Sequence, residues 1–196
     1  MKRLASLFSA LSIAFLVWGG YVYLRDWRAG PVATRPIPAP DAPKPDRPQA
    51  TAPVKLTSPV QRILIEKQAR RMTVFQKDGP AKIYRIALGF APDGDKSRQG
   101  DGRTPEGVFR IDRLNPHSRF HLSLGIDYPQ PQHRRAARAG GFDPGGDIMI
   151  HGQPNQVPQG YRVKGDWTEG CIAISNDEID EIFALTRIGT EVEIRP

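Results

Sequence analysis

The sequence predicts a mostly β single domain with two short helices, placed behind an apolar segment at the N-terminus. Three observations support this fold class. A chain of 196 residues has room for one globular domain of ordinary size and some chain besides. Short runs rich in β-branched and aromatic residues recur through residues 60–196, separated by turns containing Gly and Pro. Two further segments carry the apolar spacing or the capping residues of a helix.

The first element is the apolar segment near the N-terminus. The 21 residues from Leu4 to Leu24 carry no charge and are long enough to cross a hydrocarbon core of about 30 Å as a helix. Lys2 and Arg3 precede them, which favours an N-terminus that stays in the cytoplasm. We therefore expect residues 1–28 to be a transmembrane anchor, with a cleaved signal peptide as the alternative. In either case the rest of the chain is exported.

A proline-rich linker is expected next, over residues 29–59. Residues 30–59 contain nine prolines among Ala, Thr, Asp and Lys. Such a segment cannot bury a core and favours extended conformations, so it serves as a spacer that lets a tethered domain reach a target away from the bilayer. The predicted domain occupies residues 60–196, and apolar packing is expected to begin near Leu56.

Eight strands are expected within this domain. Alternation is clearest in residues 81–88, where Ile83 and Ala87 face one way and Tyr84 and Ile86 face the other. The expected strands are Val60–Glu66, Arg71–Gln76, Ala81–Leu88, Val108–Ile111, Phe120–Ile126, Asp147–Ile150, Ile172–Ile174 and Glu191–Ile194.

Two helices are expected between the strands. Gln132–Ala139 is short and basic. Asn176–Arg187 has the stronger signal, because Ser175 and Glu178 match a capping box and acidic residues gather at its N-terminal end. Its expected core-facing residues are Ile179, Ile182, Phe183 and Ile188.

The net charge of +7 raises the hypothesis of a nucleic-acid partner. Residues 1–55 hold 8 of the 28 basic residues and only 3 of the 21 acidic ones, so most of the excess lies in the leader and the linker. A DNA-binding protein would concentrate it in the folded domain. We therefore expect no nucleic-acid partner. The single Cys also excludes a disulfide scaffold and a four-cysteine zinc site.

That single cysteine is the leading candidate for chemistry. Cys171 follows Gly170 in a turn that leads into an apolar strand, and an unpaired thiol is unusual in an exported protein because that compartment oxidises thiols. A small buried core cysteine is the alternative interpretation. His151 ends another expected strand, and a thiol beside an imidazole is the pair that nucleophilic catalysis needs. The amides of Gly170 and Cys171 are candidates for an oxyanion hole.

Four motifs follow one another along the domain. They are Thr104–Phe109 (Thr-Pro-Glu-Gly-Val-Phe), Ser118–Gly125, Gly145–Gly152 and, separated from His151 by sixteen residues, Thr168-Glu169-Gly170-Cys171. Their order and spacing resemble the L,D-transpeptidase (YkuD-type) catalytic domain family, in the branch that has Ala after the Gly-Cys-Ile motif. The resemblance covers about residues 60–195.

The resemblance implies a β-rich fold with Cys171 as the nucleophile, His151 as its base, and no metal or cofactor. It implies the peptide stems of peptidoglycan as substrate, cleaved between diaminopimelate and D-alanine, with transfer to an amine acceptor. The acceptor would be a second stem or a lysine of a wall-anchored lipoprotein. Cell-wall biogenesis and cell shape are the processes expected. The protein would be periplasmic, held at the inner membrane by residues 1–28, and sensitive to carbapenems.

Further site residues are expected around these motifs. The resemblance alone implies that Thr168 would shape the turn or hold the imidazole. Gly152 and Trp167 would line the substrate, with a core aromatic as the alternative for Trp167. Arg119 would contact a stem carboxylate and Glu169 a ligand amine, and solvated surface charges are the alternative for both.

Two positions depart from the pattern of many family members. Ala173 stands where many carry Arg, and Glu169 stands where many carry His. The branch with Ala includes a hydrolase that severs lipoprotein–peptidoglycan links. Hydrolysis of the same class of bonds is therefore a second hypothesis, and a non-catalytic module that tethers membrane to wall is a third.

Overall fold

The computed structural model describes residues 54–196. The predicted anchor, residues 1–28, and the predicted linker up to residue 53 lie outside the described residues. Within residues 54–196, no helix combines the length and the apolar character that crossing a membrane requires.

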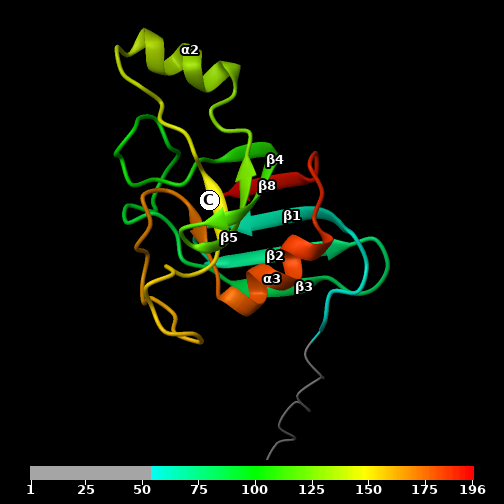
Figure 1. The fold of residues 1–196 in the computed structure, drawn as a ribbon. Coiled ribbons are helices and arrows are strands. Elements are labelled where there is room, and N and C mark those ends of the chain that lie inside the picture. Colours follow the sequence, from blue (N-terminus) through cyan, green and yellow to red (C-terminus); the bar gives the residue numbers. More distant parts are fainter. Residues whose placement is uncertain (1–53) are drawn as a thin grey trace, which may run out of the picture. The chain divides into compact units, whose positions relative to one another are not determined.

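Eight strands form one sheet in the order β3-β2-β1-β8-β4-β5-β6-β7. Figure 1 shows β8, in red, between β1 and β4. It runs parallel to β1 and antiparallel to β4, so it joins the two halves of the sheet. The strands are β1 (Val60–Glu66), β2 (Arg71–Gln76), β3 (Lys82–Arg85), β4 (Gly107–Ser118), β5 (His121–Ile126), β6 (Met149–His151), β7 (Ile172–Ala173) and β8 (Glu191–Arg195).

The longest strand, β4, takes part in both halves of the sheet. Its first residues pair with β8, and its residues from Ile111 onward pair with β5. The sequence predicted only Val108–Ile111, because the residues beyond are mostly polar and exposed, yet their backbone continues the hairpin. Isolated bridges join Ala87 to Ala173 and Gly89 to Thr168. These bridges bring the two edges of the sheet together beside the turn that precedes Cys171.

The strand predicted over residues 81–88 is shorter in the structure. Only Lys82–Arg85 is a strand, but the predicted alternation is confirmed, because Tyr84 and Ile86 are buried and Ile83 is exposed.

Both predicted helices are present, as α2 (Pro131–Ala139) and α3 (Asn176–Leu185). The capping box of α3 is confirmed: the Glu178 amide donates to Ser175 Oγ, and the Ser175 amide donates to a Glu178 carboxylate oxygen. The expectation for Ile188 was wrong. The helix ends at Leu185, so Ile188 lies beyond the apolar face and is 66% exposed.

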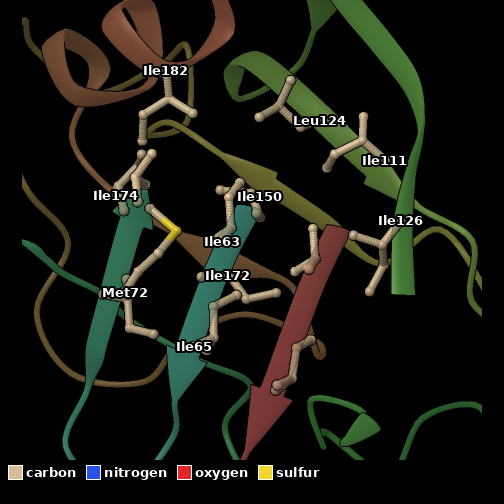
Figure 2. Packing of buried hydrophobic residues seen from close by; sticks show 14 of the residues in the cluster. Ile63, Ile65, Met72, Ile111, Leu124, Ile126, Ile150, Ile172, Ile174 and Ile182 are labelled. Carbon is tan, nitrogen blue, oxygen red and sulfur yellow. The ribbon is translucent and has the colours of Figure 1, made fainter. Parts of the chain in front are cut away.

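The core is built from branched aliphatic side chains of the strands and of α3. Figure 2 shows Ile63 and Ile65 of β1 together with Ile150, Ile172 and Ile182, which come from β6, β7 and α3. Leu56, only 3% exposed, belongs to the same cluster, and its amide donates to Glu181 Oε1 at 2.7 Å. Packing therefore begins four residues before β1.

A buried lysine holds the segment that carries the Thr-Pro-Glu-Gly motif. Lys67, 2% exposed, lies just after β1. Its ammonium donates to the carbonyl oxygens of Gly94 and Thr104 and to Glu106 Oε1, the last at 2.7 Å. Three acceptors from one loop thus meet a single donor, which fixes that loop against the end of β1.

Candidate active site

Cys171 and His151 lie on the same face of the sheet. β6 and β7 are parallel, with Ile150 opposite Ile172 and His151 opposite Ala173. Because successive side chains alternate between faces, Cys171 shares the face of His151, while Ile150 and Ile172 point into the core. The thiol and the imidazole are therefore diagonal neighbours on adjacent strands.

The orientation of the His151 ring is fixed by its own neighbour. Nδ1 lies 2.7 Å from the carbonyl oxygen of Gly152. A carbonyl only accepts, so Nδ1 carries the hydrogen in this bond and Nε2 is the nitrogen left to accept a proton. The ring is 3% exposed and packs against Phe120 and Trp167, with centroids 4.5 and 5.7 Å away. This burial lowers the pKa of His151 to about 4.

The Cys171 thiol is half-buried and un-ionised. Its Sγ donates to the carbonyl oxygen of Asp147 at 3.4 Å. Burial raises the pKa of the thiol to about 11, and the Asp147 and Glu169 carboxylates add to this rise. At neutral pH the free protein therefore holds a neutral thiol beside a neutral imidazole, and not a preformed ion pair.

Thr168 organises the turn that carries the thiol. Its hydroxyl donates to the Cys171 carbonyl at 2.7 Å and accepts from the Gly170 amide at 3.2 Å. These two contacts tie Thr168 to both residues that follow Glu169 in the turn. The Gly170 amide was expected to face an oxyanion, but in the structure it is directed to Thr168. Of the two amides considered, that of Cys171 is the remaining candidate.

Glycine is required at two positions of the site. Gly170 has a φ of +131°, and a Cβ there would lie 2.5 Å from the carbonyl oxygen of Arg103. A Cβ at Gly152 would lie 2.6 Å from Asn176 Oδ1. Gly152 thus lets α3 approach the end of β6, a packing reason that differs from the substrate contact expected of it.

Of the other expected substrate contacts, one packs against the imidazole and two are exposed charged residues. Trp167 packs directly against the His151 ring. Glu169 is exposed in the turn before Cys171. Arg119 is exposed in the short connection between β4 and β5, where its carbonyl accepts from the Asn155 amide. The structure therefore brings Trp167 to the imidazole but gives neither charged residue a contact with the His151 ring.

Two polar atoms beside His151 are buried without a partner. Ser123, 0% exposed, lies directly opposite His151 in the β5–β6 register. Among residues 54–196, its Oγ and the Nε1 of Trp167 are the buried side-chain polar atoms with no hydrogen bond. Unpaired buried polar atoms are rare and call for an explanation. The sequence analysis includes Ser123 in the motif Ser118–Gly125 but does not single it out, because it is one small residue of an expected strand.

Asp101 organises the loop that backs the turn. It accepts from Lys96 Nζ at 2.7 Å and from the amides of Ser97 and Arg103. Burial alone would raise the pKa of Asp101, but these hydrogen bonds bring it down to about 2. The carboxylate therefore stays charged, and the loop places the Arg103 carbonyl behind Gly170.

Comparisons with known proteins agree with this fold. The family described as the L,D-transpeptidase catalytic domain, YkuD, matches residues 60–194. The chain is 33% identical over 132 residues to a protein of Escherichia coli (strain K12) named as an L,D-transpeptidase, YafK, an alignment that covers 64% of this chain and 46% of that protein. It is 26% identical over 136 residues to YqjB of Bacillus subtilis (strain 168), likewise named as an L,D-transpeptidase. That alignment covers 67% of this chain and 69% of YqjB.

A solved structure gives the same result. The helical cell shape determining protein Pgp2 from Campylobacter jejuni matches with a TM-score of 0.51 and 26% identity, over 70% of this chain and 48% of that one. The chain spans about half the length of Pgp2 and of the Escherichia coli relative. Since the family match extends over more than half of the chain, this protein belongs to the YkuD family of L,D-transpeptidase catalytic domains.

Proposed function

We propose that this protein is a cysteine acyltransferase that acts on peptidoglycan stem peptides as an L,D-transpeptidase. Membership of the family supports the reaction class. The observation that carries the proposal is the strand register, which sets Cys171 and His151 on one face with Nε2 of the imidazole left to accept a proton.

The proton must move as the new bond forms. Because the pKa of the thiol is raised and that of the imidazole is lowered, neither group is charged at pH 7. Sγ of Cys171 attacks the carbonyl carbon at the L-centre of diaminopimelate while Nε2 of His151 takes the thiol proton. The imidazolium then gives this proton to the nitrogen of D-alanine as the C–N bond breaks, leaving a thioester.

An amine acceptor completes the transfer. Its nitrogen attacks the thioester carbonyl and loses a proton to Nε2, and the departing thiolate takes that proton back to restore the thiol. During both attacks the carbonyl oxygen gains negative charge, and the Cys171 amide is the donor proposed to stabilise it. The unpaired hydroxyl of Ser123 and indole N–H of Trp167 are proposed to gain partners when substrate covers His151.

Hydrolysis by the same pair is the second candidate. Water would then attack the thioester in place of the amine, with the same proton transfers. The residue at position 173 favours this possibility, because Ala173 is buried and offers no cationic side chain there. Link cleavage on a lipoprotein joined to peptidoglycan is the corresponding substrate alternative.

Location follows from the substrate. We propose that residues 1–28 hold the protein at the inner membrane and that residues 60–196 work in the periplasm. Membrane fractionation of cells that express the full chain tests this, and recovery in the cytosolic fraction would contradict it.

The reaction is tested with purified full-length protein and a disaccharide tetrapeptide, analysed by mass spectrometry. Cross-linked dimer with released D-alanine is the expected product. Tripeptide with released D-alanine would instead establish a carboxypeptidase. Cys171→Ala and His151→Gln should abolish both products, whereas His117→Gln, at an exposed histidine, should leave them unchanged. No product from the unaltered protein would overturn the proposal and favour a link-cleaving hydrolase that needs another substrate, or a non-catalytic tether.

A further inference from the structure

An arginine lies on the catalytic face of the sheet, in the same row as the thiol. Arg113 of β4 is paired with Gly125 of β5, which is paired with Met149 of β6. The β6–β7 register continues this row to Cys171. Paired residues share a face, so Arg113 lies on the side of the sheet that carries the nucleophile.

The Arg113 side chain lies across β5 toward the nucleophile. A Cβ built on Gly125 would be 3.3 Å from Arg113 Nε, so the absence of a side chain there leaves the path open. Nη2 of Arg113 donates to Asp147 Oδ1 at 2.9 Å. The backbone carbonyl of Asp147 is also the acceptor for Cys171 Sγ. The guanidinium thus ends beside the residue that contacts the thiol.

The partner that Arg113 has in the free protein is easily replaced. The side chains of Arg113 and Asp147 are 49% and 82% exposed, and exposed ion pairs contribute little. A guanidinium presents five N–H donors in a planar fork that matches a carboxylate with two parallel bonds. An incoming carboxylate can therefore take the place of Asp147.

The spacing selects one carboxylate of the stem. Strands about 4.8 Å apart put β4 and β7 roughly 14 Å apart, and the extended arginine covers about half of this, leaving roughly 7 Å to the thiol. In diaminopimelate five carbons separate the scissile carbonyl from the distal carboxylate, an extended span of roughly 7–8 Å. The carboxylate of the terminal D-alanine lies closer, at roughly 4 Å.

We propose that Arg113 binds the distal carboxylate of diaminopimelate in the donor stem, which makes it a specificity-determining residue. This inference rests on the proposed function, because it takes the substrate from there. Sequence patterns did not single out Arg113, since an exposed charge in a strand has the ordinary appearance of a solvated side chain.

The test measures binding, so that it does not depend on turnover. Full-length protein carrying Cys171→Ala is titrated by calorimetry with a disaccharide tetrapeptide whose distal carboxylate is either free or amidated. Amidation should weaken binding about tenfold. Adding Arg113→Gln should weaken binding of the free stem by a similar factor and remove the difference between the two stems. Arg110→Gln, an exposed arginine of the same strand, should preserve that difference.

The other possible outcomes distinguish failure of the inference from failure of the proposed function. If amidation costs the same factor with and without Arg113→Gln, the inference fails. A further stem, in which the carboxylate of the terminal D-alanine is amidated, tests the choice of carboxylate. If the loss of binding caused by this amidation disappears with Arg113→Gln, Arg113 binds the D-alanine carboxylate and the inference is overturned. If neither stem binds, both the inference and the proposed substrate fail. Binding that depends on both Arg113 and the free distal carboxylate, with no release of D-alanine by the unaltered protein, would support the inference and refute only the proposed function.

Discussion

The burial of His151 makes the folded domain sensitive to acid. Burial lowers the pKa of the imidazole to about 4, from an ordinary value of 6.5 that it regains in the unfolded chain. Between these values the unfolded chain binds a proton and the folded protein does not. The contribution to stability is therefore fully present above pH 6.5 and is lost as the pH falls toward 4. Each pKa unit corresponds to about 1.4 kcal/mol, so the complete loss is about 3.5 kcal/mol, and about 2 kcal/mol of it has occurred by pH 5.

Urea denaturation at pH 7 and pH 5 measures this contribution. The unaltered protein should lose about 2 kcal/mol more of its free energy of unfolding than His151→Gln does. Asp101, with a pKa of about 2, stays charged at both pH values in both proteins, so the difference isolates the imidazole. His117→Gln, which changes an exposed histidine, should follow the unaltered protein. Equal losses in the unaltered protein and His151→Gln would refute the reasoning from burial.

Lys67→Met should lower the free energy of unfolding by about 3 kcal/mol, because it leaves Glu106 and two carbonyls of the loop without their donor. Lys77→Met, at an exposed position, should change the free energy of unfolding by less than about 0.5 kcal/mol. Equal melting temperatures of Lys67→Met and Lys77→Met in calorimetry would contradict the role given to Lys67. Gly170→Ala should slow D-alanine release about tenfold or more, since the added Cβ displaces the catalytic turn; an unchanged rate would argue against the turn's role. A carbapenem should acylate Cys171 and add its mass to the protein, whereas an unmodified mass at millimolar drug would count against an accessible, reactive thiol.

Local signals in the sequence were sufficient to predict most elements of the fold. Alternation placed Tyr84 and Ile86 on one face, which the structure shows to be the buried one, and the capping box of Ser175 and Glu178 located the start of α3. The length of β4 could not be predicted in this way, because its second half is held by backbone pairing with β5 and not by apolar side chains. Neither could the position of β8, since strand order depends on contacts between residues far apart in the chain.

The same distinction between local signals and long-range contacts applies to the candidate site. Residue type and position at strand ends were enough to select Cys171 and His151, but only the register shows that they share a face. Lys67 was missed because a charged residue after a strand has the appearance of a solvated one, while its acceptors lie 27 to 39 residues further along. Arg113 was missed for a related reason, since its direction depends on the missing side chain of Gly125.

The place of β8 in the sheet constrains when the surroundings of Cys171 can form. A chain synthesised from its N-terminus produces β1 through β7 first, and until residues 191–195 are available, β1 and β4 each lack a neighbour. The bridge from Ala87 to Ala173 joins the edges of the two half-sheets, so the surroundings of Cys171 depend on their union. The surroundings of Cys171 are therefore complete only after residues 191–195 have joined the two half-sheets, and not while synthesis has reached only β7.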